Sequence, residues 1–127
     1  RDGLNSNLGF SDKDRDENIR RIGEVASLFA KAGFIVITSI ISPFSKGRKK
    51  ALEAFKTNSH EIYLSCDIET CEKRDPKGLY KKARQGKIPN FTGIDSIYEK
   101  PINPDLEIDT SKVSLSKAVK KILNIIN

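Results

Sequence analysis

Positive charge is concentrated in one short stretch, residues 73–87, which read KRDPKGLYKKARQGK. This stretch holds seven basic residues and one acidic residue, whereas the other 112 residues carry 16 of each sign, so it accounts for the whole net charge of +6. Such a dense cluster suits a compact anion, for example a nucleotide phosphate. A nucleic-acid surface would spread its charge along a face and interleave aromatic residues, and here Tyr80 is the one aromatic residue. Composition alone favours a solvated basic helix over an anion site.

Two polar residues near the start of a predicted helix also have a spacing that suits binding. Arg15 and Asn18 lie three positions apart and share a helix face, which Ile19 and Ile22 continue towards the core. A polar pair at the open end of a buried stripe is well placed to line a cleft. The alternative is an ordinary surface pair in the first helical turn, and the spacing alone does not overturn it.

The ends of the predicted strands are a second place where chemistry is expected. In open parallel sheets, ligands bind beyond the carboxyl ends of the strands, and this rule selects Ile41–Ser42, Cys66–Asp67 and Asp109–Thr110. Because Ser42 precedes a proline, its backbone is expected to be extended. Its hydroxyl group either faces a ligand or belongs to an ordinary turn, and the two interpretations are about even.

The histidine and cysteine content does not indicate a metal or redox site. Cys66 and Cys71 have four residues between them, which is neither a redox pair nor a zinc half-site, so we expect two reduced thiols of an intracellular protein. His60 is the only histidine and is expected at the surface. No G-x-x-x-x-G-K-[ST] phosphate loop occurs, which makes this stretch, taken literally, a poor candidate for phosphoryl transfer on its own.

Local signals then predict the elements that must position these residues. Ser11 and Asp14 form a helix-capping pattern, and Gly33 ends the helix that follows. Residues 34–41, FIVITSII, are a continuous β-branched run, which indicates a strand covered on both faces. The other predicted elements are helices at 45–56, 68–74, 77–85 and about 114–126, and strands at 61–66 and 106–109. The expected buried stripes are Ile19, Ile22, Val25, Ala26 and Phe29 in the first helix, and Leu115, Val119, Ile122, Leu123 and Ile126 in the last.

This alternation predicts an α/β domain with a parallel sheet and flanking helices. The 127 residues suit a single domain, and a mixture of 31% charged and 37% hydrophobic residues is typical of a globular protein. No apolar run approaches the roughly 20 residues that span a bilayer. Three strands are few for such a sheet and the chain starts at Arg1 without a methionine, so we expect an N-terminal part to be missing.

Residues 87–105 show no periodicity and contain three prolines and one glycine. A loop of this length inside a compact domain is usually a lid, a binding loop or disordered. We expect a lid that is mobile without ligand and ordered with nucleotide.

Three long motifs resemble the adenylylsulfate kinase family, and together they cover essentially the whole chain. They are GLNSNLGFSDKDRDENIRRIGEVASLFAKAGFIVITSIISPF, RDPKGLYKKARQGKIPNFTGID and YEKPINPDLEIDT. The resemblance implies a P-loop kinase fold and transfer of the γ-phosphate of ATP, with Mg²⁺, to the 3′-hydroxyl of adenosine 5′-phosphosulfate (APS). The product, 3′-phosphoadenosine 5′-phosphosulfate (PAPS), belongs to sulfate assimilation. A homodimer, a cytoplasmic location, and no nucleic-acid or membrane partner are also implied, and a fusion to a sulfurylase domain is compatible with the family.

The resemblance also implies roles for individual residues. Arg1 and Arg15 look like the arginines that hold the sulfate and phosphate oxyanions, and Phe10 like the ring that stacks on adenine. Arg74 resembles the arginine that lies against the ATP base, and Lys77 the basic residue at the base of the lid. The remaining positions carried over are Asn18, Ile41 and Ser42 at the substrate site, and Asn90, Phe91, Thr92, Gly93, Ile94 and Asp95 in the lid. Ser42 also matches the family's phosphoserine position, although direct in-line transfer needs no covalent step.

Two departures from the family pattern bear on function. The phosphate loop and a D-G-D-N segment, expected immediately before Arg1, do not occur, so we expect this stretch alone to be inactive. Asn90 stands where the family usually has glycine, and Asn tolerates left-handed geometry better than most residues. The leading interpretation is therefore a truncated adenylylsulfate kinase domain spanning residues 1–127. The alternatives are a non-catalytic nucleotide-binding module derived from it, and a general anion- or nucleic-acid-binding protein.

Overall fold

The computed structural model describes residues 3–54 and 59–126, which form two compact units. The first unit contains the residues up to Ser59 together with Ile97–Lys100. The second contains His60–Ser96 and Pro101–Asn127. The prediction of a single domain is not tested by this division and stays a prediction.

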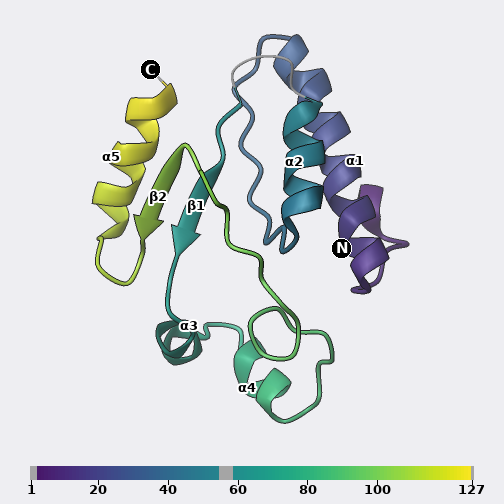
Figure 1. Ribbon diagram of the computed structural model, residues 1–127, viewed down its shortest axis with the longest axis vertical. Coiled ribbons are helices and arrows are strands. Elements are labelled where there is room, and N and C mark those ends of the chain that lie inside the picture. The colour runs from purple at the N-terminus through teal and green to yellow at the C-terminus, as the bar shows by residue number, and fades with distance from the viewer. Residues whose placement is uncertain (1–2, 55–58, 127) are drawn as a thin grey trace. The chain divides into compact units, whose positions relative to one another are not determined.

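Two packed helices form the frame of the first unit (Figure 1). A short 3₁₀ helix, η1 (Gly3–Asn5), precedes α1 (Asp12–Lys31), and α2 (Ser45–Glu53) lies against α1. The Ser11 side chain accepts a hydrogen bond from the Asp14 N–H at 3.2 Å, which confirms the predicted cap. Small residues allow the close approach of the helices, because a Cβ added to Gly23 would lie 3.5 Å from the Cβ of Ala51.

The segment between α1 and α2 is not a strand, so the prediction for residues 34–41 is wrong. No described residue forms a backbone ladder with this segment, and a strand requires a paired neighbour. The side chains of Phe34, Ile35, Ile37 and Ile41 are between 62% and 78% exposed, and are not covered on both faces. A β-branched composition favours a strand, but a strand forms only where a partner strand is available to pair with it.

The second unit is built around a two-stranded parallel sheet. β1 (Ile62–Ser65) pairs with β2 (Leu106–Asp109), with Ile62 opposite Leu106 and Ser65 opposite Asp109. Three helices complete the unit, namely α3 (Ile68–Arg74), α4 (Leu79–Arg84) and α5 (Leu115–Ile126). Ile108 in β2 is 1% exposed and is the most deeply buried large side chain of the core.

Both predicted apolar stripes are only partly buried. In α1, Ile19 and Ala26 are buried as expected, whereas Phe29 is 52% exposed. In α5, the expected burial is wrong for Leu115, Val119 and Leu123, which are exposed. Periodicity identifies an apolar face, but burial also requires an element that covers it, and the described residues provide none for this part of α5.

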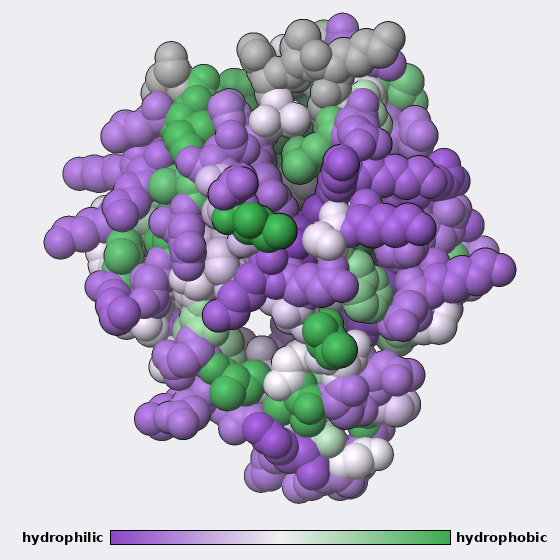
Figure 2. Space-filling view, viewed as in Figure 1, coloured by the Kyte–Doolittle hydropathy of each residue, from purple (hydrophilic) through white to green (hydrophobic). Residues whose placement is uncertain are grey.

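Hydrophilic side chains predominate on the face shown in Figure 2, with separate apolar patches among them. Among the described helices, none combines the length and apolar character that crossing a membrane requires.

Candidate functional site

Arg15 and Phe10, two residues expected at a substrate site, lie against each other. The Arg15 Nε–H donates a hydrogen bond to the Phe10 carbonyl oxygen at 3.0 Å, and the guanidinium carbon lies 6.0 Å from the centre of the Phe10 ring. Arg15 is 8% exposed and Phe10 is 61% exposed. The alternative of a solvated surface arginine is therefore wrong, because this cation is held in the protein beside an open aromatic ring.

Asn18 follows on the same face of α1 and is half-buried, and Ile19 beyond it is 3% exposed. The predicted gradient from polar residues to core along α1 is thus present. A buried guanidinium attracts an anion more strongly than an exposed one, because less water screens its charge. An aromatic ring beside it offers a stacking surface for a nucleobase. Arg1, the other arginine expected here, lies outside the described residues.

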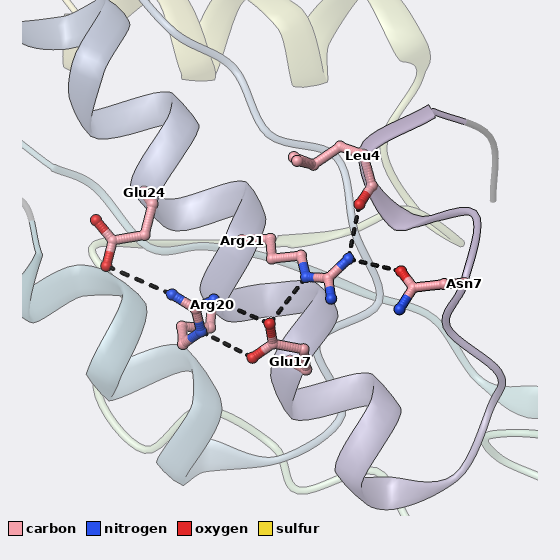
Figure 3. Close-up of polar contacts among 6 residues, drawn as sticks. All are labelled: Leu4, Asn7, Glu17, Arg20, Arg21 and Glu24. Atoms are coloured by element: carbon pink, nitrogen blue, oxygen red, sulfur yellow. Dashed lines mark hydrogen bonds and ion pairs between the residues drawn. The ribbon is translucent and has the colours of Figure 1, made fainter.

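A polar network lies on α1, and one of its members, Arg21, holds the segment that precedes Phe10 (Figure 3). The Arg21 Nη1 group donates to the carbonyl oxygen of Leu4 and to the Asn7 side chain, both at 2.8 Å. Glu17 accepts from Arg20 at 2.7 Å and from Arg21 at 2.8 Å, and these hydrogen bonds lower the pKa of Glu17 to about 2. The sequence did not reveal this network, because its members are up to 17 positions apart.

Ser42 has a left-handed backbone with a φ of 41°, so the expectation of an extended conformation is wrong. Pro43 disfavours some backbone conformations of Ser42, but a tertiary hydrogen bond also acts on the Ser42 backbone. The Arg48 Nη1 group donates to the Ser42 carbonyl oxygen at 2.8 Å. Ile41 is 62% exposed and Ser42 is half-buried, so both residues are accessible to solvent.

Arg48 and Glu99 bind the backbone around Ser42, and the sequence did not point to either residue. Arg48 is 9% exposed, and its Nη2 group donates to the Glu99 carbonyl oxygen at 2.8 Å. The Glu99 carboxylate accepts from the Ser45 N–H at 2.7 Å and the Ser45 hydroxyl at 2.6 Å, and these hydrogen bonds lower the pKa of Glu99. No local pattern could reveal a pair of residues 51 positions apart.

The predicted lid motif folds into a tight turn. Asn90 has a φ of 56°, which is the left-handed geometry that favours glycine and that asparagine tolerates. The Asp95 carboxylate accepts hydrogen bonds from the backbone N–H groups of Asn90 and Phe91, at 2.8 and 2.5 Å. Gly93, with a φ of 89°, donates to the Ser96 carbonyl oxygen at 2.8 Å. Thr92 and Ile94 in the same turn are half-buried.

Phe91 is half-buried against Tyr80 of α4. The two rings meet edge to face, with centroids 5.0 Å apart and an angle of 71° between their planes. Partial burial, followed by a hydrogen bond with Cys71, raises the pKa of Tyr80 to about 12. Tyr80 remains neutral at physiological pH and packs against Phe91.

Arg74 lies at the carboxyl edge of the parallel sheet, where the strand-end rule places a ligand. Its Nη2 group donates to the Thr110 carbonyl oxygen at 2.8 Å, and its Nη1 group lies 3.9 Å from the Cys66 sulfur. The arginine thus reaches the residues that follow both β1 and β2. Arg74 and Lys77 are both exposed. Cys66 and the nearby Cys71 are free thiols, as predicted.

No group of three or more His, Cys, Asp or Glu side chains that could hold a metal ion occurs in the described part of the chain.

Residues 1–109 match the family model described as adenylylsulphate kinase. The chain belongs to the adenylylsulphate kinase family. It is 57% identical over 123 residues to the probable adenylyl-sulfate kinase of Halalkalibacterium halodurans, which covers 96% of this chain and 61% of that protein. It is 61% identical over 111 residues to the adenylyl-sulfate kinase of Bacillus licheniformis, which covers 87% of this chain and 56% of that protein. The chain thus spans about three fifths of the length of these curated relatives.

Solved structures of adenylylsulphate kinases have the same fold. The Mycobacterium tuberculosis APS kinase in complex with AMPPNP and APS is 41% identical, with a TM-score of 0.94 over 98% of this chain and 73% of that one. A hexameric APS kinase from Thiobacillus denitrificans is 28% identical, with a TM-score of 0.67 over 98% of this chain and 21% of that one. The predicted α/β architecture of the P-loop kinase type is confirmed. The alternative of a non-catalytic module receives no support, and the residue roles remain predictions.

Proposed function

We propose that the protein to which this chain belongs is an adenylylsulfate kinase that phosphorylates the 3′-hydroxyl of APS. The γ-phosphoryl group of ATP is transferred to the 3′-oxygen, the hydroxyl proton is released, and PAPS and ADP are the products. The observation that carries the proposal is the match of residues 1–109 to the family, since this range includes both the Phe10–Arg15 pair and the lid turn.

Arg15 and Phe10 are proposed to bind APS. The guanidinium group of Arg15 neutralises the sulfate or phosphate oxygens, and the exposed Phe10 ring stacks on adenine. Arg1 is assigned the same anion-binding role from the family resemblance alone. Asn18 adds a polar group on the same helix face, and Ile41 and Ser42 line the same substrate site.

On the ATP side, Arg74 is proposed to lie against the base, and Lys77 to supply positive charge at the base of the lid. Transfer of a phosphoryl group depends mostly on positioning and on stabilisation of charge. Mg²⁺ supplies part of that charge when it is bound together with ATP. The described residues contribute binding and orientation, and direct transfer needs no phosphorylated Ser42.

The lid turn from Asn90 to Asp95 is proposed to close over the nucleotides and exclude water. Phe91 is proposed to cover the adenine of APS. We also propose a homodimer in the cytoplasm, from the family resemblance.

The experiment that tests this function is a product assay on the complete protein. With ATP, Mg²⁺ and APS, the proposal expects equimolar PAPS and ADP. The matched control is 3′-dephospho-coenzyme A, whose free hydroxyl lies next to an adenine but which lacks the sulfate, and it should not be phosphorylated at a comparable rate. ADP formation without PAPS, or equal use of the two acceptors, would refute the proposal.

A further inference from the structure

The backbone of Ser42 is strained, which means that its surroundings must hold it in place. A left-handed φ is sterically unfavourable in a residue other than glycine. Ser42 has a φ of 41° and lies in the proposed APS site. Such conformations persist where neighbouring structure over-determines them, and they concentrate at functional sites.

The Arg48 side chain holds Ser42 in this conformation. Its guanidinium group lies within the first unit at 9% exposure and donates to two backbone carbonyl oxygens, those of Ser42 and Glu99, each at 2.8 Å. The Tyr98 ring lies beside it, with its centre 5.8 Å from the guanidinium carbon. A planar fork can bridge two carbonyl groups in this way, whereas a lysine offers a single nitrogen.

Glu99 caps the N-terminal end of α2. The N-cap residue of α2, Phe44, makes no side-chain capping hydrogen bond. The Glu99 carboxylate instead accepts from the N–H and hydroxyl of Ser45, and the Glu99 N–H donates to the Pro43 carbonyl oxygen at 2.8 Å. A carboxylate at this end of a helix satisfies an unpaired N–H and favourably meets the helix dipole.

We propose that Arg48 and Glu99 are positioning residues that hold Ser42 in its binding conformation and anchor the chain directly after the lid turn. Residues 97–100 follow Ser96, which accepts a hydrogen bond from Gly93 of the lid turn, and Glu99 fixes them to Pro43 and Ser45. The hydrogen bonds of Arg48 and Glu99, which we call the clamp, therefore join the proposed APS site to the residues that follow the lid turn. This inference rests on the proposed function, since it names APS as the ligand whose site is positioned.

The test compares Arg48→Lys and Arg48→Met with the matched control Arg20→Met in the complete protein. Arg20 is an arginine on α1 whose side chain is 45% exposed and whose ion pairs lie on the helix surface. Steady-state kinetics with APS and ATP varied separately give the two KM values. We expect both Arg48 variants to raise the KM for APS by about tenfold or more, because small displacements of a binding site are costly. The KM for ATP of the Arg48 variants should change by no more than about twofold. The same limit should hold for the KM for APS and the KM for ATP of Arg20→Met.

A second readout follows the clamp directly and does not depend on catalysis. In Arg48→Lys and in Ser45→Ala, which removes one donor to Glu99, amide exchange of residues 97–100 should be faster than in the wild type. The exchange of α5 should not change. If Arg48→Met does not fold, these two milder variants still decide the question.

The outcomes separate this inference from the proposed function. A wild-type protein that does not use APS would refute the proposed function, and the amide exchange alone would then decide whether the clamp exists. A wild type that uses APS, with Arg48 variants that show an unchanged KM for APS or an equal rise in both KM values, would overturn the positioning role. A purely structural role predicts a loss of folded protein without a selective change in the KM for APS.

Discussion

The Asp95 carboxylate accepts a hydrogen bond from the backbone N–H of Asn90 at 2.8 Å, across a turn that Asn90 enters with a left-handed φ of 56°. The side chain at one end of the turn thus holds the backbone at the other end. This arrangement explains how an asparagine can occupy a left-handed position of the kind that favours glycine. The carboxylate stabilises the turn, and asparagine tolerates the backbone conformation.

The stability of Asn90 variants should depend on how well the new residue tolerates a positive φ. We expect Asn90→Gly to change the free energy of unfolding by no more than about 0.5 kcal/mol. Asn90→Val should lower it by about 1–2 kcal/mol, because a β-branched residue is strained at positive φ. Denaturant unfolding of the two variants and the wild type measures the difference. If both variants had the same stability, the left-handed conformation of Asn90 would not be a constraint in solution.

Glu17 should make stability depend on pH in the acidic range. Hydrogen bonds from Arg20 and then Arg21 lower its pKa from 4.5 to about 2 in the folded protein. A depressed pKa in the folded state adds stability above the unfolded pKa, and this stability is lost as the pH falls from 4.5 towards 2. Glu17→Gln should therefore be less stable than the wild type at neutral pH, with a gap that narrows through this window. High salt should reduce the gap as well, since the ion pairs are exposed.

The measurement for Glu17 is denaturant unfolding of both proteins from neutral pH down into this window. Glu53→Gln, at an exposed position of α2, is the control and should show a pH profile parallel to that of the wild type. A gap between Glu17→Gln and the wild type that stays constant with pH would contradict the role of the carboxylate charge.

Ile108 should be a major contributor to the stability of the second unit. It is 1% exposed, so Ile108→Ala should lower the free energy of unfolding by about 2–5 kcal/mol through lost burial and a residual cavity. Ile102 is 90% exposed in the same unit, and Ile102→Ala should change it by no more than about 0.5 kcal/mol. Thermal or denaturant unfolding distinguishes the two. Equal effects would mean that β2 is not packed in solution as described.

Arg74 should affect ATP more than APS. If the guanidinium group lies against the ATP base, Arg74→Ala should weaken the binding of ATP by about 2- to 5-fold, which corresponds to the 0.5–1 kcal/mol of an exposed cation–π contact. The neighbouring Lys73→Ala is a matched loss of charge and should have less effect. Calorimetric titration with each nucleotide measures both affinities. A greater loss of affinity for APS than for ATP would assign Arg74 to the APS site instead.

The sequence predicted those features that are set by local chemistry. Ser11 and Gly33 mark the ends of α1, and the strands at Ile62–Ser65 and Leu106–Asp109 were found within about one residue. Features that depend on a distant partner were missed or wrong. Residues 34–41 carry the composition of a strand without a paired neighbour, and Arg48 meets Glu99 across 51 positions. At the site, spacing suggested Arg15 but could not show that it is buried beside Phe10.

The most direct test of the proposed substrate site is calorimetric titration of APS and ATP into the wild type, Arg15→Ala and Arg15→Lys of the complete protein. A hydrogen bond to a charged group contributes about 1.5–3 kcal/mol, so Arg15→Ala should weaken APS binding roughly 10- to 150-fold and ATP binding much less. Arg15→Lys should recover only part of the affinity, because lysine keeps the charge but lacks the planar fork. Arg20→Ala is the control for a surface arginine and should bind both nucleotides as the wild type does. Unchanged APS affinity in folded Arg15→Ala would contradict the substrate site proposed here.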